Sequence, residues 1–169
     1  MERSARLVGA VHVACRVALV VVLLWSGIAK ASDRQTAILS VSAYDLLPNS
    51  LAEPVGTILP WLEIGLGVLL LAGLFLRPAA VLAAGLMVAF LVAMGQAKAR
   101  GLEIDCGCFG EGGPGEGVTW LDLGRDGALL AAAAFLAWRP SGPFQLDRYL
   151  LREDDDDARD EGQAAAVEG

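Results

Sequence analysis

Cysteine and histidine are scarce in this chain. It contains three cysteines and one histidine among 169 residues, and only Cys106 and Cys108 lie close together. A protein zinc site takes three or four side-chain ligands, so a metal centre at this pair would need ligands from elsewhere in the chain. We therefore expect no metal site, and metal binding stays an alternative to the chemistry developed below.

Positive charge is also scarce. The 13 Lys and Arg residues are outnumbered by 20 Asp and Glu residues, which gives a net charge of −7. We expect no nucleic-acid partner, although the net charge says little about the partners of the folded core, because most of it comes from the C-terminal tail. Much of the acidity lies in the run Glu153-Asp154-Asp155-Asp156-Asp157. Since this region has little apolar content to bury, we predict a largely disordered, cytoplasmic acidic tail over residues 141–169.

The residues that are abundant are apolar. Hydrophobic residues make up 55% of the chain and the mean hydropathy is +0.52, which is too apolar for a water-soluble domain of this size. A helix needs about 20 apolar residues to cross a bilayer. Stretches approaching that length lie at about 10–30, 55–76, 78–98 and 119–138. We predict an all-α integral membrane four-helix bundle over residues 10–140, preceded by a cytoplasmic segment at 1–9.

The first stretch follows Arg3 and Arg6, as the hydrophobic part of a signal peptide would. Its apolar run continues through Val17 to Trp25, which is too long for such a segment, and residues 26–30 offer no convincing cleavage site. We expect this stretch to be retained as a membrane-spanning helix.

Basic residues set the expected orientation in the cell membrane. With both termini in the cytoplasm, the inner side carries slightly more arginine and lysine than the outer side, as the positive-inside rule requires. The inner residues are Arg3, Arg6, Arg77, Arg139, Arg148 and Arg152, with Arg16 nearby, and the outer ones are Lys30, Arg34, Lys98, Arg100 and Arg125. This multi-pass topology places Cys106 and Cys108 outside the cytoplasm, where disulfides persist.

Three local patterns predict how the helices connect and pack. Residues 35–48 favour a short interfacial helix ended by Pro48, and Arg77-Pro78 predicts a tight hairpin between the second and third spans. Small residues at four-residue spacing predict two packing ridges. These ridges are Gly85, Ala89 and Ala93, and Gly124, Ala128 and Ala132.

The polar residues of the first span are expected to lie near the inner membrane surface. His12 and Arg16 are one turn apart, and contact with lipid head groups accounts for both. Cys15 is interpreted as a small apolar residue far from the other two cysteines.

Cys106-Gly107-Cys108 forms the candidate redox centre. A disulfide across one residue closes a small, strained ring, and strain makes such a bond exchangeable. Exchange needs an attacking thiolate and a second thiol to resolve the mixed disulfide. Asp105 would raise the pKa of a neighbouring thiol, whereas Lys98, Arg100 or Lys30 would lower it if near. A static disulfide is the alternative besides metal binding.

Glu63 is the second candidate site residue. A carboxylate about two turns inside an apolar helix is costly unless it has a partner in the bundle interior. Lys30 and Arg125 are the candidate partners, because both lie near the outer ends of their helices. Such a cluster would either move a proton during exchange or clamp three helices together.

An ordered set of these features resembles the methylamine utilisation MauE family, within the DoxX-like group of four-helix membrane proteins. The matching elements are Gly27 and Lys30, Tyr44-Asp45-Leu46-Leu47-Pro48, Pro60 and Glu63, Cys106-Gly107-Cys108-Phe109-Gly110, and Arg125-Asp126. The resemblance implies a redox-associated membrane protein linked to maturation of methylamine dehydrogenase, with a thioredoxin-like partner, MauD.

The expected function is therefore thiol–disulfide exchange that supports disulfide formation or maturation of extracytoplasmic proteins, as a component of a thiol–disulfide oxidoreductase system. The expected partners are the lipid bilayer and a thioredoxin-like or other extracytoplasmic thiol protein. Two alternatives stay open. One is a non-catalytic scaffold or assembly factor with a structural disulfide, and the other is a quinone-coupled oxidoreductase subunit, although no residue pattern specifies a quinone or any other cofactor.

Overall fold

The chain is described by a computed structural model that covers residues 2–46, 48–102 and 118–139. These residues form helices and connecting segments without any strand, which confirms the all-α class. The helices are α1 (Glu2–Ser32), α2 (Arg34–Ala43), α3 (Asn49–Ala72), α4 (Leu76–Ala99) and α5 (Trp120–Trp138). The Cys106-Gly107-Cys108 sequence and the acidic tail lie outside the described residues.

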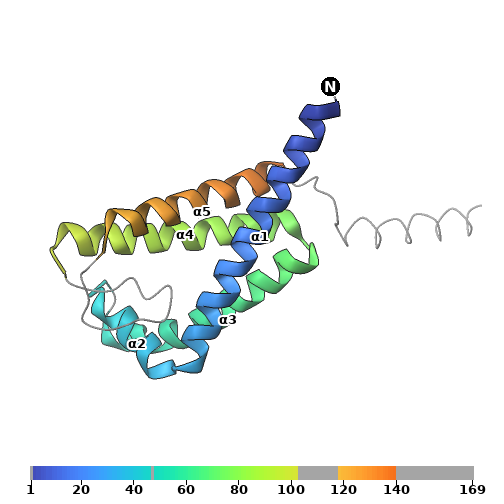
Figure 1. The fold of residues 1–169 in the computed structure, drawn as a ribbon. Coiled ribbons are helices and arrows are strands. Elements are labelled where there is room, and N and C mark those ends of the chain that lie inside the picture. The colour runs from blue at the N-terminus through green and yellow to red at the C-terminus, as the bar shows by residue number, and fades with distance from the viewer. Residues whose placement is uncertain (1, 47, 103–117, 140–169) are drawn as a thin grey trace, which may run out of the picture.

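The long helices pack as two crossing pairs (Figure 1). Helix α1 lies along α3, and α4 lies along α5, while α1 also contacts α5 and α3 contacts α4. Helix α2 packs on α3. It lies at the end of the molecule where α4 finishes and α5 begins, and Arg100 at the end of α4 pairs with Asp45 beyond α2 at 2.9 Å.

Three of these helices are long and apolar enough to cross a membrane. The candidate spans are Leu7–Ser32, Ser50–Ala72 and Leu76–Ala99. Large apolar side chains face outward along them, including Val21, Leu71 and Leu82, each more than half exposed. Helix α5 carries three charged residues in its first two turns and is not among the candidate spans. The fourth span therefore stays a prediction, while the three apolar helices mark a membrane protein.

Two connections lie at other residues than the sequence predicts. The turn between the second and third spans was expected at Arg77-Pro78, but α3 ends at Ala72 and the chain turns through Gly73 and Phe75, which have φ angles of +71° and +47°. Pro78 lies in the first turn of α4, where its missing N–H costs nothing. Pro48 does not end the short helix, which finishes at Ala43; it stands immediately before α3 instead.

The core lies where the four long helices meet. Leu19, Leu23, Leu70 and Leu136 are buried there. Helices α1 and α3 approach closely, because a Cβ on Gly27 would lie 2.9 Å from the Pro60 carbonyl oxygen and one on Gly67 would lie 2.8 Å from Leu24 Cδ2. Glycine is therefore needed where α1 crosses α3.

Most residues of the two predicted packing ridges do not pack against the described helices, although Ala132 is partly buried against the core. A Cβ on Gly85 or Gly124 would meet nothing within 4 Å, and Ala89 and Ala128 are exposed. Helix α4 packs instead through a different face that contains Ala79, Ala80, Ala83 and Met87. Both faces of α4 are apolar and contain small residues, so spacing alone cannot identify the buried one.

Candidate functional site: a buried ionic cluster between four helices

An ion pair joins α1 to α3 inside the bundle. Lys30 Nζ donates a hydrogen bond to Glu63 Oε1 at 2.7 Å, and the Glu63 side chain is fully buried. The ammonium group also lies 4.8 Å from the centroid of the Phe90 ring on α4, within range of a cation–π interaction. Glu63 lies about four turns into α3, deeper than expected, because α3 begins at Asn49.

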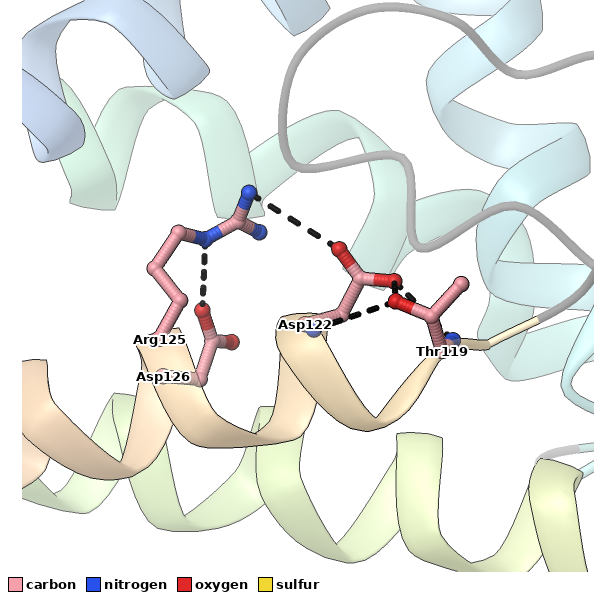
Figure 2. Close-up of polar contacts among 4 residues, drawn as sticks. All are labelled: Thr119, Asp122, Arg125 and Asp126. Carbon is pink, nitrogen blue, oxygen red and sulfur yellow. Dashed lines mark hydrogen bonds and ion pairs between the residues drawn. The ribbon is translucent and has the colours of Figure 1, made fainter.

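Helix α5 contributes a second group of charges (Figure 2). Arg125 lies between two acids of its own helix, 3.5 Å from Asp126 and 3.8 Å from Asp122. Asp122 also completes the N-terminal cap of α5, because its Oδ2 accepts hydrogen bonds from the backbone N–H and the hydroxyl of Thr119. Arg125 thus extends the ionic cluster along α5 while Asp126 lies in the interior.

Glu63 and Asp126 line the same small cavity. Its volume is about 10 Å³, and its walls come from α1, α3, α4 and α5. The lining residues are Val22, Leu23, Ser26, Glu63, Met87, Phe90 and Asp126. Oε2 of Glu63 and Oδ2 of Asp126 are buried without a hydrogen-bond partner among the described residues. A space of this size holds about one water molecule.

Asp126 and Ser26 are the two polar cavity residues that were not predicted from the sequence as site residues. Asp126 is 2% exposed, although it lies only two turns from the start of α5. An acid so close to the end of a helix is expected at the membrane interface, and Asp126 was therefore not predicted in the bundle interior. The signal that identified Glu63, an acid within an otherwise apolar helix, applies equally to Asp126.

The residues on the two sides of the cysteine-bearing segment contact each other. Lys98 Nζ on α4 donates to the carbonyl of Val118 at 2.7 Å and lies 4.8 Å from the centroid of the Trp120 ring. Val118 is buried against Met94 and Ala97. These contacts place the residues on either side of 103–117 at one end of the bundle. Asp105, Cys106 and Cys108 themselves lie outside the described residues.

The opposite part of α1 serves packing. His12 is 2% exposed and its ring lies 6.3 Å from that of Phe135 on α5, so the expected contact of His12 with lipid head groups is wrong. Arg16 donates from Nε to the carbonyl of Leu70 at 2.6 Å and from a terminal nitrogen to that of Leu71 at 3.0 Å. These are end carbonyls of α3, which lack partners within their own helix. Cys15 is half-buried against the core.

Comparison with known proteins assigns the family. The family described as methylamine utilisation protein MauE matches residues 8–139. The methylamine utilization protein MauE of Methylorubrum extorquens is 39% identical over 137 residues, which cover 78% of this chain and 73% of the relative. Proteins of the same name from Methylophilus methylotrophus and Paracoccus denitrificans are 38% and 36% identical, over 52% and 57% of this chain and 46% and 52% of their own lengths. No solved structure gives a significant match. The chain belongs to the MauE family.

Proposed function

We propose that this MauE-family membrane protein supports methylamine utilisation by exchanging thiol and disulfide through Cys106 and Cys108 on the outer side of the cell membrane. The observation that carries the proposal is the Cys-Gly-Cys spacing in the segment joining α4 to α5, within a chain whose relatives are named for methylamine utilisation. One S–S bond breaks and another forms in each exchange, so two electrons and two protons pass between this chain and its partner.

The described structure supports this proposal through the anchoring of the segment. Lys98 and Val118 hold its two sides together, and the pair of Arg100 with Asp45 joins the same end of the bundle to the region of α2. These contacts fix the ends of the two helices that the cysteine-bearing segment connects.

The partner we propose is a thioredoxin-like or other extracytoplasmic thiol protein, because exchange requires a second pair of thiols. The proposed topology has four spans, with both termini in the cytoplasm and α5 as the fourth span. Glu63 and Lys30 would then clamp α1 to α3 beneath the redox segment, since their ion pair joins these two helices directly.

Thiol trapping in intact cells tests the proposal. A membrane-impermeant alkylating reagent is applied to the full-length protein and to Cys106→Ser and Cys108→Ser, before and after reduction. Labelling that appears on reduction, with a mixed disulfide trapped in one single variant, supports exchange and identifies the partner. Cys15→Ser, combined with the trapping substitution, is the matched control and leaves the trapped adduct unchanged.

Two other outcomes contradict the proposal. A pair that stays oxidised under every condition and traps no partner indicates a scaffold with a structural disulfide. Thiols that become labelled only after cell lysis indicate that the pair faces the cytoplasm, which is the reverse of the proposed topology. The pathway is tested separately by growth on methylamine of a strain that lacks the gene, complemented with the wild type or with Cys106→Ser; equal growth of the two excludes a role of the cysteine pair.

A further inference from the structure

We propose that the cavity between Glu63 and Asp126 is a proton-binding site, in which the two carboxyl groups hold one proton between them together with one water molecule. The proposal does not depend on the chemistry of Cys106 and Cys108. It concerns a site built from four helices, each of which contributes at least one wall residue.

The first observation is a shortage of hydrogen-bond donors. An ionised carboxylate only accepts hydrogen bonds, and one oxygen of Glu63 and one of Asp126 have no partner among the described residues. Ser26 contributes the hydroxyl group that lines the cavity. A proton on either acid converts one of the two acceptors into a donor, which satisfies both groups directly or through a water molecule.

The second observation is the balance of charge around the cavity. Lys30 of α1 forms an ion pair with Glu63, and Arg125 of α5 forms ion pairs with both Asp126 and Asp122 of the same helix. Helix α4 lines the cavity with the uncharged side chains of Met87 and Phe90. Two buried carboxylates that share a site do not both ionise readily, because like charges repel in a medium of low dielectric constant.

A metal ion is a weaker explanation for the same cavity. No group of three or more His, Cys, Asp and Glu residues within 2–46, 48–102 and 118–139 is arranged to hold one. The Lys30 ammonium group bound to Glu63 also repels a cation. A proton requires only the two carboxyl groups.

Infrared spectroscopy of the full-length protein in detergent micelles tests the proposal. The C=O stretch of a protonated carboxylic acid is separate from the bands of carboxylates and shifts in D2O. We expect a band from one protonated carboxyl group per chain at neutral pH. Glu63→Gln and Asp126→Asn each remove it, because the new amide supplies the missing donor and the remaining acid ionises. The exposed Glu53 provides the control, and Glu53→Gln retains the band.

The variant Lys30→Gln distinguishes loss of the bound proton from a failure of the protein to fold. Removal of this positive charge stabilises the bound proton, so the band persists to more alkaline pH than in the wild type. An unfolded chain has fully hydrated, ionised carboxylates and loses the band instead. Three results would each overturn the proposal. The wild type could lack the band at neutral pH, or both amide variants could retain it. In the third case, the band of Lys30→Gln would disappear at a lower pH than that of the wild type.

Discussion

At the scale of single residues, the ion pair of Lys30 with Glu63 carries the strongest prediction for stability. The Glu63 side chain is fully buried and that of Lys30 is 11% exposed. Lys30→Met leaves a buried acid without its counter-ion, which costs about 3 kcal/mol, toward the lower end for a broken buried pair because proton uptake relieves part of the penalty. Thermal or denaturant unfolding in detergent micelles measures the loss.

The double variant Lys30→Gln/Glu63→Gln supplies the control for this prediction. Two neutral amides at these positions form a hydrogen bond and leave no buried charge, so most of the stability returns. A Lys30→Met protein as stable as the wild type would show that the pair does not clamp α1 to α3.

At the scale of helices, the crossing of α1 and α3 depends on Gly27. An added Cβ would lie 2.7 Å from Ile64 Cγ1, 2.9 Å from the Pro60 carbonyl oxygen and 3.1 Å from Glu63 Cβ. The Pro60 oxygen belongs to the backbone and cannot rotate away. Gly27→Ala therefore forces the helices apart and destabilises the protein by about 1–3 kcal/mol, the usual range for overpacking.

Gly85 is the matched control for this crossing. It lies within α4 and has nothing within 4 Å of an added Cβ. Gly85→Ala is therefore neutral or stabilising by up to about 1 kcal/mol, because alanine favours the helix. Equal unfolding midpoints for Gly27→Ala and Gly85→Ala would contradict a close crossing of α1 and α3.

Helix α2 is expected to weaken in acid. Asp33 caps its N-terminus, and the hydrogen bond from the Thr36 hydroxyl, with a second from the Thr36 N–H, lowers the pKa of Asp33 below its usual value of 3.8. Because the pKa of Asp33 is lower in the folded than in the unfolded state, the cap stabilises α2 fully at any pH above the pKa of the unfolded state. This stabilisation is lost as the pH falls below 3.8 and through the lower pKa of Asp33 in the folded state.

Hydrogen exchange of the α2 amides measures this loss, with protection compared between the wild type and Asp33→Asn. Asparagine keeps a side-chain oxygen as acceptor but does not titrate. Protection of α2 therefore falls in acid in the wild type and changes less in the variant. Parallel losses in the two proteins would exclude Asp33 as the cause.

At the scale of the whole molecule, the sequence predicts where the long helices lie better than which faces they bury. Long apolar runs are enough for the first, because few other structures accommodate them. In a membrane, however, the lipid-facing and buried sides are both apolar. That is why the ridge at Gly85 was predicted wrongly. Asp126 carries the same sequence signal as Glu63, but only the packing of four helices shows that the two carboxyl groups share a cavity.

The fourth span is the feature of the whole molecule that most needs a test. Helix α5 has 19 residues, a length of about 28 Å that matches the hydrocarbon core of a bilayer. Trp120 and Trp138 stand at its two ends and are 78% and 85% exposed, as expected for aromatic residues at the two membrane surfaces. Its charged residues Asp122, Arg125 and Asp126 pair with one another or face the interior, which lowers their cost in a membrane.

If α5 crosses the membrane, the two termini share one side and the segment from α4 to α5 lies on the other. A reporter that fluoresces only in the cytoplasm should then be active when fused at either terminus. A fusion after Arg100 should be inactive, whereas an enzyme that requires export should be active there. If α5 lies on the membrane surface instead, the C-terminal fusion behaves like the fusion after Arg100. That result would leave three spans and would place Asp126 and its cavity at the membrane interface.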